Sequence, residues 1–127
     1  MPATATPVET YALWVPPAGP FRLLHWHTTT TPQSALGCDT ARPASLTSEL
    51  TMWTDDDLPL TRRPRNSRAQ DLMRAYQPHP SLCFGDALFT GTTGATSDEV
   101  HGLTFDQALT LIDLYCGTIT HAPGPGH

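Results

Sequence analysis

The sequence contains no lysine, one asparagine, two isoleucines and no apolar run longer than a few residues. Lysine, asparagine and isoleucine have AT-rich codons, so their scarcity indicates a GC-rich gene and not a chemical requirement. Because there is no long apolar run, we expect no segment to span a membrane. The opening stretch MPATATPVET has no positive charge followed by apolar residues, so we expect no secretory signal.

Cysteine is also scarce. Cys38, Cys83 and Cys116 stand 45 and 33 residues apart and form no C-x-x-C pair. An odd number of cysteines without paired spacing favours reduced thiols, as in a cytoplasmic protein, over a disulfide framework. A nucleophilic cysteine would need His79 or His101 brought beside it by the fold, whereas a cysteine in an apolar strand is usually a small buried hydrophobe.

The residues that are present indicate one folded domain. The 127 residues are 39% hydrophobic and 15% charged, which excludes a charge-rich disordered chain and a coiled coil. We expect a loose segment at 1–9, a single domain over 10–120 and a disordered, Pro/Gly-rich tail at 121–127. The formal net charge of −5 predicts no general affinity for nucleic acid or anionic membranes.

Short apolar segments rich in β-formers predict the strands. Residues 28–42 are expected to be irregular except for one helical turn at Ser34–Leu36, and Gly85 is expected to mark a bulge or a close backbone approach. Strands mostly adjacent in sequence, with two amphipathic helices, predict an α+β fold: an antiparallel or mixed sheet of about five strands with two helices packed on one face. The expected strands are Tyr11–Val15, Phe21–His27, Leu46–Thr54, Ser81–Thr90 and a short return at Val100–His101.

The two helices have recognisable start signals. Asn66 is expected to cap the first helix, because its side-chain oxygen can accept from a free backbone N–H. Thr104 and Gln107 form a capping box at the start of the second helix, and Gly117 is placed to end it. The expected core face of the first helix is Ala69, Leu72, Met73 and Tyr76; that of the second is Phe105, Ala108, Leu109, Ile112 and Tyr115, broadened by Leu111.

The segment Leu50–Leu114, about half of the chain, resembles a small family of domains of unknown function that is frequent in actinobacterial genomes, phages and plasmids. It departs from that family in the arginine-rich insertion before Asn66 and in the Pro/Thr-rich stretch at 28–43. The resemblance implies a mobile-element or accessory setting and no particular reaction. The matching motifs are Leu50–Trp53, Asp55–Asp57, Asn66-Ser67-Arg68-Ala69, Gly85–Gly91 and Leu103-Thr104-Phe105-Asp106-Gln107.

His25 and His27 share one face of a predicted strand, a spacing that metal sites on β-sheets use. Trp26 between them takes the opposite face, so a buried Trp26 would direct both histidines outward. We therefore expect no stoichiometric metal and no cofactor, and we keep His25 and His27 as alternative metal ligands. A third ligand would have to come from Asp39, Glu49, His79, His101 or His121, none of which has a recognisable spacing.

The charge distribution is uneven. Residues 61–74 contain five arginines and one aspartate, whereas the rest of the chain contains two arginines and eleven acids. Arg62, Arg63, Arg65 and Arg68 are therefore predicted to form a contact surface for phosphate or for an acidic partner. The alternative is internal neutralisation by Asp55–Asp57, a triplet that lacks the spacing of a calcium loop. Both interpretations stay open.

These observations favour a non-catalytic cytoplasmic binding or accessory protein of mobile-element type, which docks to a protein or a nucleic acid through the arginine-rich loop. A homo-oligomer is compatible with this interpretation. One alternative is a small metal-dependent hydrolase that uses His25, His27 and a carboxylate. Another is an acidic anti-defence inhibitor of a host nucleic-acid-binding protein.

Overall fold

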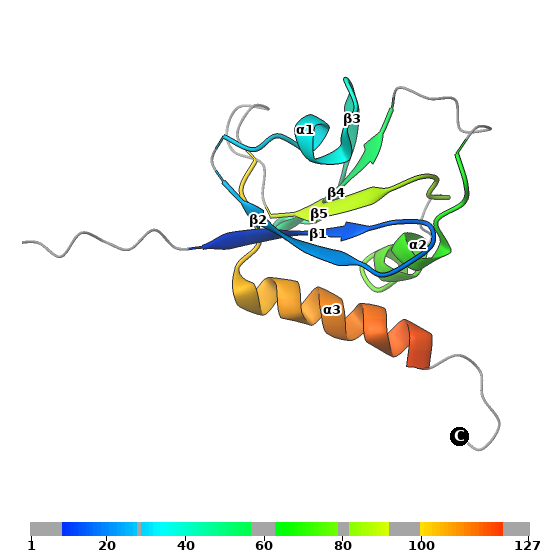
Figure 1. The fold of residues 1–127 in the computed structure, drawn as a ribbon. Helices are drawn as coiled ribbons and strands as arrows, with labels where there is room; N and C mark the ends of the chain where they lie inside the picture. The colour runs from blue at the N-terminus through cyan, green and yellow to red at the C-terminus, as the bar shows by residue number, and fades with distance from the viewer. Residues whose placement is uncertain (1–8, 28, 57–62, 79–81, 92–99, 121–127) are drawn as a thin grey trace, which may run out of the picture.

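The computed structural model describes residues 9–27, 29–56, 63–78, 82–91 and 100–120. Residues 118–120 are described as backbone only. Its centre is a five-stranded antiparallel sheet with the strand order β2-β1-β5-β4-β3 (Figure 1). The predicted α+β fold is thus confirmed, and the sheet has no parallel pair among its named strands. The strands are β1 (Thr10–Val15), β2 (Arg22–Trp26), β3 (Ala41–Thr47), β4 (Leu50–Asp55) and β5 (Ala87–Thr90).

Helices cover both faces of the sheet. Two of them, α2 (Ser67–Arg74) and α3 (Phe105–Thr120), contact each other and lie on one face, as expected. The third, α1 (Pro32–Leu36), lies on the opposite face, above the sheet in Figure 1 while α3 lies below it. The predicted helical turn is therefore present, but its role as the cover of a second face was not predicted.

Each face has its own hydrophobic core. The larger core lies under α2 and α3 and includes Leu13, Leu72 and Phe89, all fully buried. The smaller core lies on the α1 face and includes Trp26 and Trp53. Burial on both faces explains why all four residues of β5 are buried, since this strand lies at the centre of the sheet.

Both predicted helix starts are confirmed. The Asn66 side-chain oxygen accepts from the backbone N–H of Ala69 at 3.0 Å. The Gln107 backbone N–H donates to the Thr104 hydroxyl at 3.1 Å, and the Thr104 N–H donates to the Gln107 amide oxygen at 2.9 Å. Gly85 was expected to mark a bulge or a close backbone approach; what the structure shows there is a φ of +75°, a left-handed conformation that favours glycine, with the Arg63 side chain packed against it.

The predicted single strand Leu46–Thr54 is wrong. The chain turns at Ser48–Glu49, and its two halves belong to β3 and β4, which pair as an antiparallel hairpin. Strand β3 begins at Ala41, inside the segment expected to be irregular. The apolar alternation continues across the turn, and the turn has neither Gly nor Asn, so the period-2 pattern could not reveal the reversal.

The facing and the end of α3 also differ from the prediction. Leu109 is 40% exposed and Phe105 is 51% exposed, whereas Ala108, Leu111 and Tyr115 are buried. The apolar residues of α3 extend around the helix well beyond one stripe, and tertiary contacts with α2 and β1 select which of them face the core. Gly117 does not end the helix, because its φ is not positive and α3 continues to Thr120.

Two further predictions hold only in part. Strand β5 covers Ala87–Thr90, so the first half of the expected strand Ser81–Thr90 is not part of it. At the expected return Val100–His101, the His101 carbonyl accepts from the Gly91 N–H at 2.8 Å. Most of the loose segment 1–9, the turn within 91–99 and the tail 121–127 lie outside the described residues.

Of the helices described, none is long and apolar enough to cross a bilayer.

Candidate functional site

The two histidines of the metal hypothesis point away from the core. Trp26 between them is 4% exposed, and its indole N–H donates to the Val100 carbonyl at 2.9 Å. His25 and His27 are exposed, and the His25 ring lies 5.2 Å from the Tyr11 ring. Across the described ranges, no three metal-ligating side chains come together. His79 and His121 lie outside these ranges.

Cys83 is buried in the larger core, as expected for a small hydrophobe. Burial raises the pKa of its thiol to about 11, and the nearby Arg63 guanidinium opposes this only in part. The thiol is therefore protonated at neutral pH and is a poor nucleophile. The structure provides no contact that would pair Cys83 with a base, since His101 is exposed and His79 is not described.

A half-buried carboxyl group near the end of β4 has no counterpart in the sequence-based predictions. Burial raises the pKa of Asp86; the Trp14 indole opposes the rise, and the Asp55 carboxylate adds to it. Asp56 pairs with Arg42 at 3.6 Å, an ion pair between two exposed side chains. Asp57 lies outside the described residues. Asp56 of the aspartate triplet thus pairs with Arg42, which lies outside the arginine-rich segment.

The four arginines predicted to form one surface occupy different environments. Arg68 points inward from α2: its guanidinium donates to the Gly19 carbonyl and to the Tyr115 hydroxyl, the latter at 2.9 Å. These contacts join α2 to the β1–β2 connection and to α3. Arg68 is thus occupied by internal contacts, and Arg62 lies outside the described residues.

Arg63 and Arg65 lie just before α2. Arg65 is exposed, and its guanidinium donates to the Gln70 amide oxygen at a long 3.4 Å. Arg63 is half-buried against Gly85: a Cβ added to Gly85 would lie 3.1 Å from the Arg63 Cδ. Arg63 also lines a cavity of about 760 Å³ between α2 and the β3–β4 hairpin.

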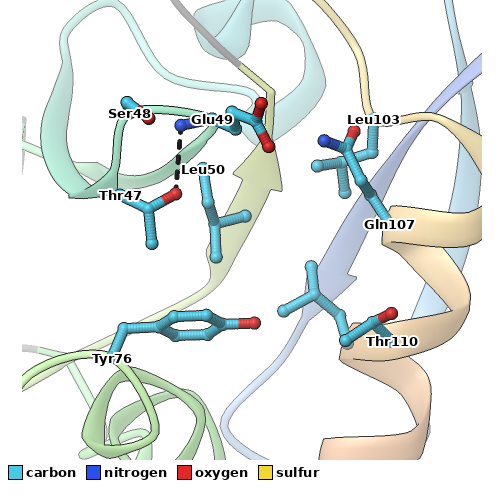
Figure 2. A pocket seen from close by; sticks show the side chains of 9 residues that line it. Thr47, Ser48, Glu49, Leu50, Tyr76, Leu103, Gln107 and Thr110 are labelled. Atoms are coloured by element: carbon cyan, nitrogen blue, oxygen red, sulfur yellow. Dashed lines mark hydrogen bonds between the residues drawn. The ribbon is translucent and has the colours of Figure 1, made fainter.

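A second cavity, here called the hairpin–helix cleft, lies wholly within described residues. It has a volume of about 380 Å³ and separates the β3–β4 turn from the first half of α3. In Figure 2 the turn stands opposite Gln107 and Thr110 of α3, and the Tyr76 ring lies along the lower side of the cleft with its hydroxyl toward α3. The lining residues are Thr47, Ser48, Glu49, Leu50, Tyr76, Leu103, Gln107, Thr110 and Leu111.

The cleft combines an apolar floor with a polar rim. Leu50, Leu103 and Leu111 are buried members of the larger core and form the floor. On the rim, the Glu49 carboxylate and the Tyr76 hydroxyl have no polar partner among the described residues, and Gln107 uses only its oxygen, in the capping box. Burial raises the pKa of Tyr76 further above neutral, and its protonated hydroxyl can donate a hydrogen bond at neutral pH.

No sequence motif pointed to this cleft. Its residues come from three distant segments. The sequence predicts other roles for two of its polar residues: Glu49 in the middle of a strand and Gln107 in a helix cap. An apolar cavity with a few convergent polar groups, within the size range of small-molecule sites, is the usual architecture of a binding pocket. The sequence matches no protein-family model, no curated protein and no solved structure.

Proposed function

We propose that this chain is a non-catalytic binding protein and that the hairpin–helix cleft is its binding site. The observation that carries the proposal is the contrast between the buried leucine floor and the rim of unpartnered polar groups. An apolar floor favours a ligand through the area removed from water, and the rim groups orient it through hydrogen bonds. Glu49, Tyr76 and Gln107 supply both acceptors and donors for that purpose.

The composition of the cleft supports binding over chemistry. Its lining contains no histidine or cysteine, and its one carboxylate, on Glu49, lies on an exposed turn. The Thr110 hydroxyl donates to the Asp106 carbonyl at 3.0 Å, so it is held by its own helix and is not activated by a base. The lining groups suit recognition better than nucleophilic or acid–base catalysis.

The test is a fragment screen observed by amide chemical shifts of the full chain. We expect some fragments to shift signals of the β3–β4 turn and of the first half of α3. Thr110→Trp should fill the cleft and abolish these shifts, because Thr110 lies on its wall. Leu109→Trp, on the exposed flank of the same helix, is the matched control and should leave them unchanged. Equal binding by both variants would refute the proposed site.

A second candidate follows from the arginine-rich segment. Exposed Arg65 has one long hydrogen bond, which supports docking of an acidic protein or of nucleic acid, with Arg63 beside it. This candidate keeps the cytoplasmic, accessory role of mobile-element type that the sequence resemblance implies. Arg68 is engaged internally, so Arg63 and Arg65 are the contact residues of this candidate within the described part of the chain, and Arg62 lies outside it.

A further inference from the structure

The charge at the hairpin–helix cleft is negative. Glu49 is its only charged lining residue. The neighbouring helix α3 has Asp106 and Asp113 on exposed positions and contains no lysine or arginine. The whole chain has a formal net charge of −5. A ligand entering the cleft therefore meets negative potential at the rim and a leucine surface below it, and an anionic ligand would be repelled.

We infer that the cleft takes a compact amphipathic amine, with its protonated nitrogen at Glu49 and its apolar body on Leu50, Leu103 and Leu111. This inference rests on the proposed function and adds the chemical class of the ligand. An ammonium group supplies only donors, which the Glu49 carboxylate can accept. The Tyr76 ring lies on the opposite side of the cleft from Glu49 (Figure 2) and adds an aromatic surface for the apolar body.

Other features of the rim favour a small ligand. The β3–β4 turn and α3 border the cleft on opposite sides, and Tyr76 borders it below (Figure 2). The Thr47 hydroxyl accepts from the Glu49 backbone N–H at 3.0 Å, which fixes the turn that presents the carboxylate. The carboxylate is thus held on an ordered turn beside the apolar floor. The volume of about 380 Å³ is at the low end for drug-sized ligands.

The experiment compares three probes of similar shape and different charge: 2-phenylethylamine, 2-phenylethanol and 3-phenylpropanoate. Dissociation constants are measured by amide chemical shifts on the full chain, at low and at high salt. We expect the amine to bind about three- to fivefold more tightly than the alcohol, the size expected for an exposed ion pair. The carboxylate should bind most weakly, and added salt should weaken only the preference for the amine.

Two variants locate the effect. Glu49→Gln should make the amine and the alcohol bind equally, whereas Asp113→Asn removes the same charge from the exposed face of α3 and should preserve the preference. If the alcohol binds wild type as tightly as the amine, or if Glu49→Gln keeps the preference, the amine inference is wrong while the binding site stands. If no probe shifts the signals of the cleft at millimolar concentration and the fragment screen also fails, both proposals are wrong.

Discussion

Arg68 and Tyr115 hold α2 and α3 together. The Arg68 guanidinium donates to the Tyr115 hydroxyl at 2.9 Å, and its central carbon lies 5.9 Å from the centre of the Tyr115 ring. The same guanidinium donates to the Gly19 carbonyl in the β1–β2 connection. One side chain thus joins three segments that are distant in sequence. Its charged guanidinium makes contacts within the protein.

Arg68→Gln should therefore destabilise the protein by about 1–3 kcal/mol, because two hydrogen bonds and a cation–π contact are lost. Arg65→Gln is the matched control, since Arg65 is exposed and makes one long hydrogen bond. Its effect should stay within about 0.5 kcal/mol. The measurement is urea unfolding of both variants, and equal midpoints would contradict the internal role of Arg68.

Leu111→Ala should cost about 2–5 kcal/mol, because Leu111 is 1% exposed and its removal leaves a cavity in the larger core. Leu109→Ala should cost less than about 1 kcal/mol, because Leu109 is 40% exposed. The sequence pattern predicts Leu109 as a core residue, so this pair of variants tests the observed facing of α3. A larger loss for Leu109→Ala than for Leu111→Ala would restore the predicted facing.

Asn66→Ala should be among the most damaging polar substitutions. Asn66 is fully buried; its amide nitrogen donates to the Val15 carbonyl at 2.9 Å and to the Gly85 carbonyl at 2.8 Å, and its oxygen caps α2. The substitution removes a donor from each of these two carbonyls and the cap of α2, at about 3 kcal/mol or more.

Asn66→Asp separates the two roles of Asn66. It keeps the oxygen that caps α2 and removes the amide donors, so it should be at least as destabilising as Asn66→Ala if the donors matter. Thermal unfolding of the two variants makes the comparison. A nearly neutral Asn66→Asp would mean that only the cap contributes.

The buried thiol predicts a dependence of stability on alkaline pH. The pKa of Cys83 is about 11 in the folded chain and is 9.0 for an ordinary thiol. Between these values the unfolded chain loses its thiol proton and the folded chain keeps it, so stability falls as pH rises. Between pH 8 and pH 10.5, wild type should lose about 2 kcal/mol more than Cys83→Ala. Parallel losses in the two proteins would show that Cys83 does not contribute.

The arginine candidate has its own test. Arg63→Gln with Arg65→Gln should lower the salt concentration at which the protein elutes from heparin, a polyanionic probe. Arg74→Gln removes a charge that already pairs with Asp71 at 3.3 Å and is the control. Unchanged elution of the double variant would remove this surface from consideration.

The sequence predicted features that depend on local chemistry. The Asn66 cap and the Thr104–Gln107 box each involve groups a few residues apart, and both are confirmed. The tight turn at Ser48–Glu49 was missed because it lacks the residues that usually mark such turns.

Features that depend on distant contacts could not be predicted in this way. The Arg68 side chain points inward because it hydrogen-bonds to Gly19 and Tyr115, which are 49 and 47 residues away in sequence. The cleft needs the hairpin turn, Tyr76 and the start of α3 to meet in space, and no spacing in the sequence encodes that meeting. Local signals therefore identified the elements, whereas the candidate site arose from their assembly.

The hydrogen bonds of Asn66 have a consequence for how the molecule opens. Its amide bonds link the end of β1, at Val15, to Gly85 ahead of β5, while its oxygen holds the first turn of α2. The first turn of α2 cannot fray without disturbing the sheet. In turn, the end of β1 and the Gly85 segment cannot separate while the first turn of α2 persists. Amide hydrogens at the start of α2, Ala69 in particular, should therefore exchange with solvent only in openings that also break the centre of the sheet, and not by the independent fraying that is usual for a short surface helix.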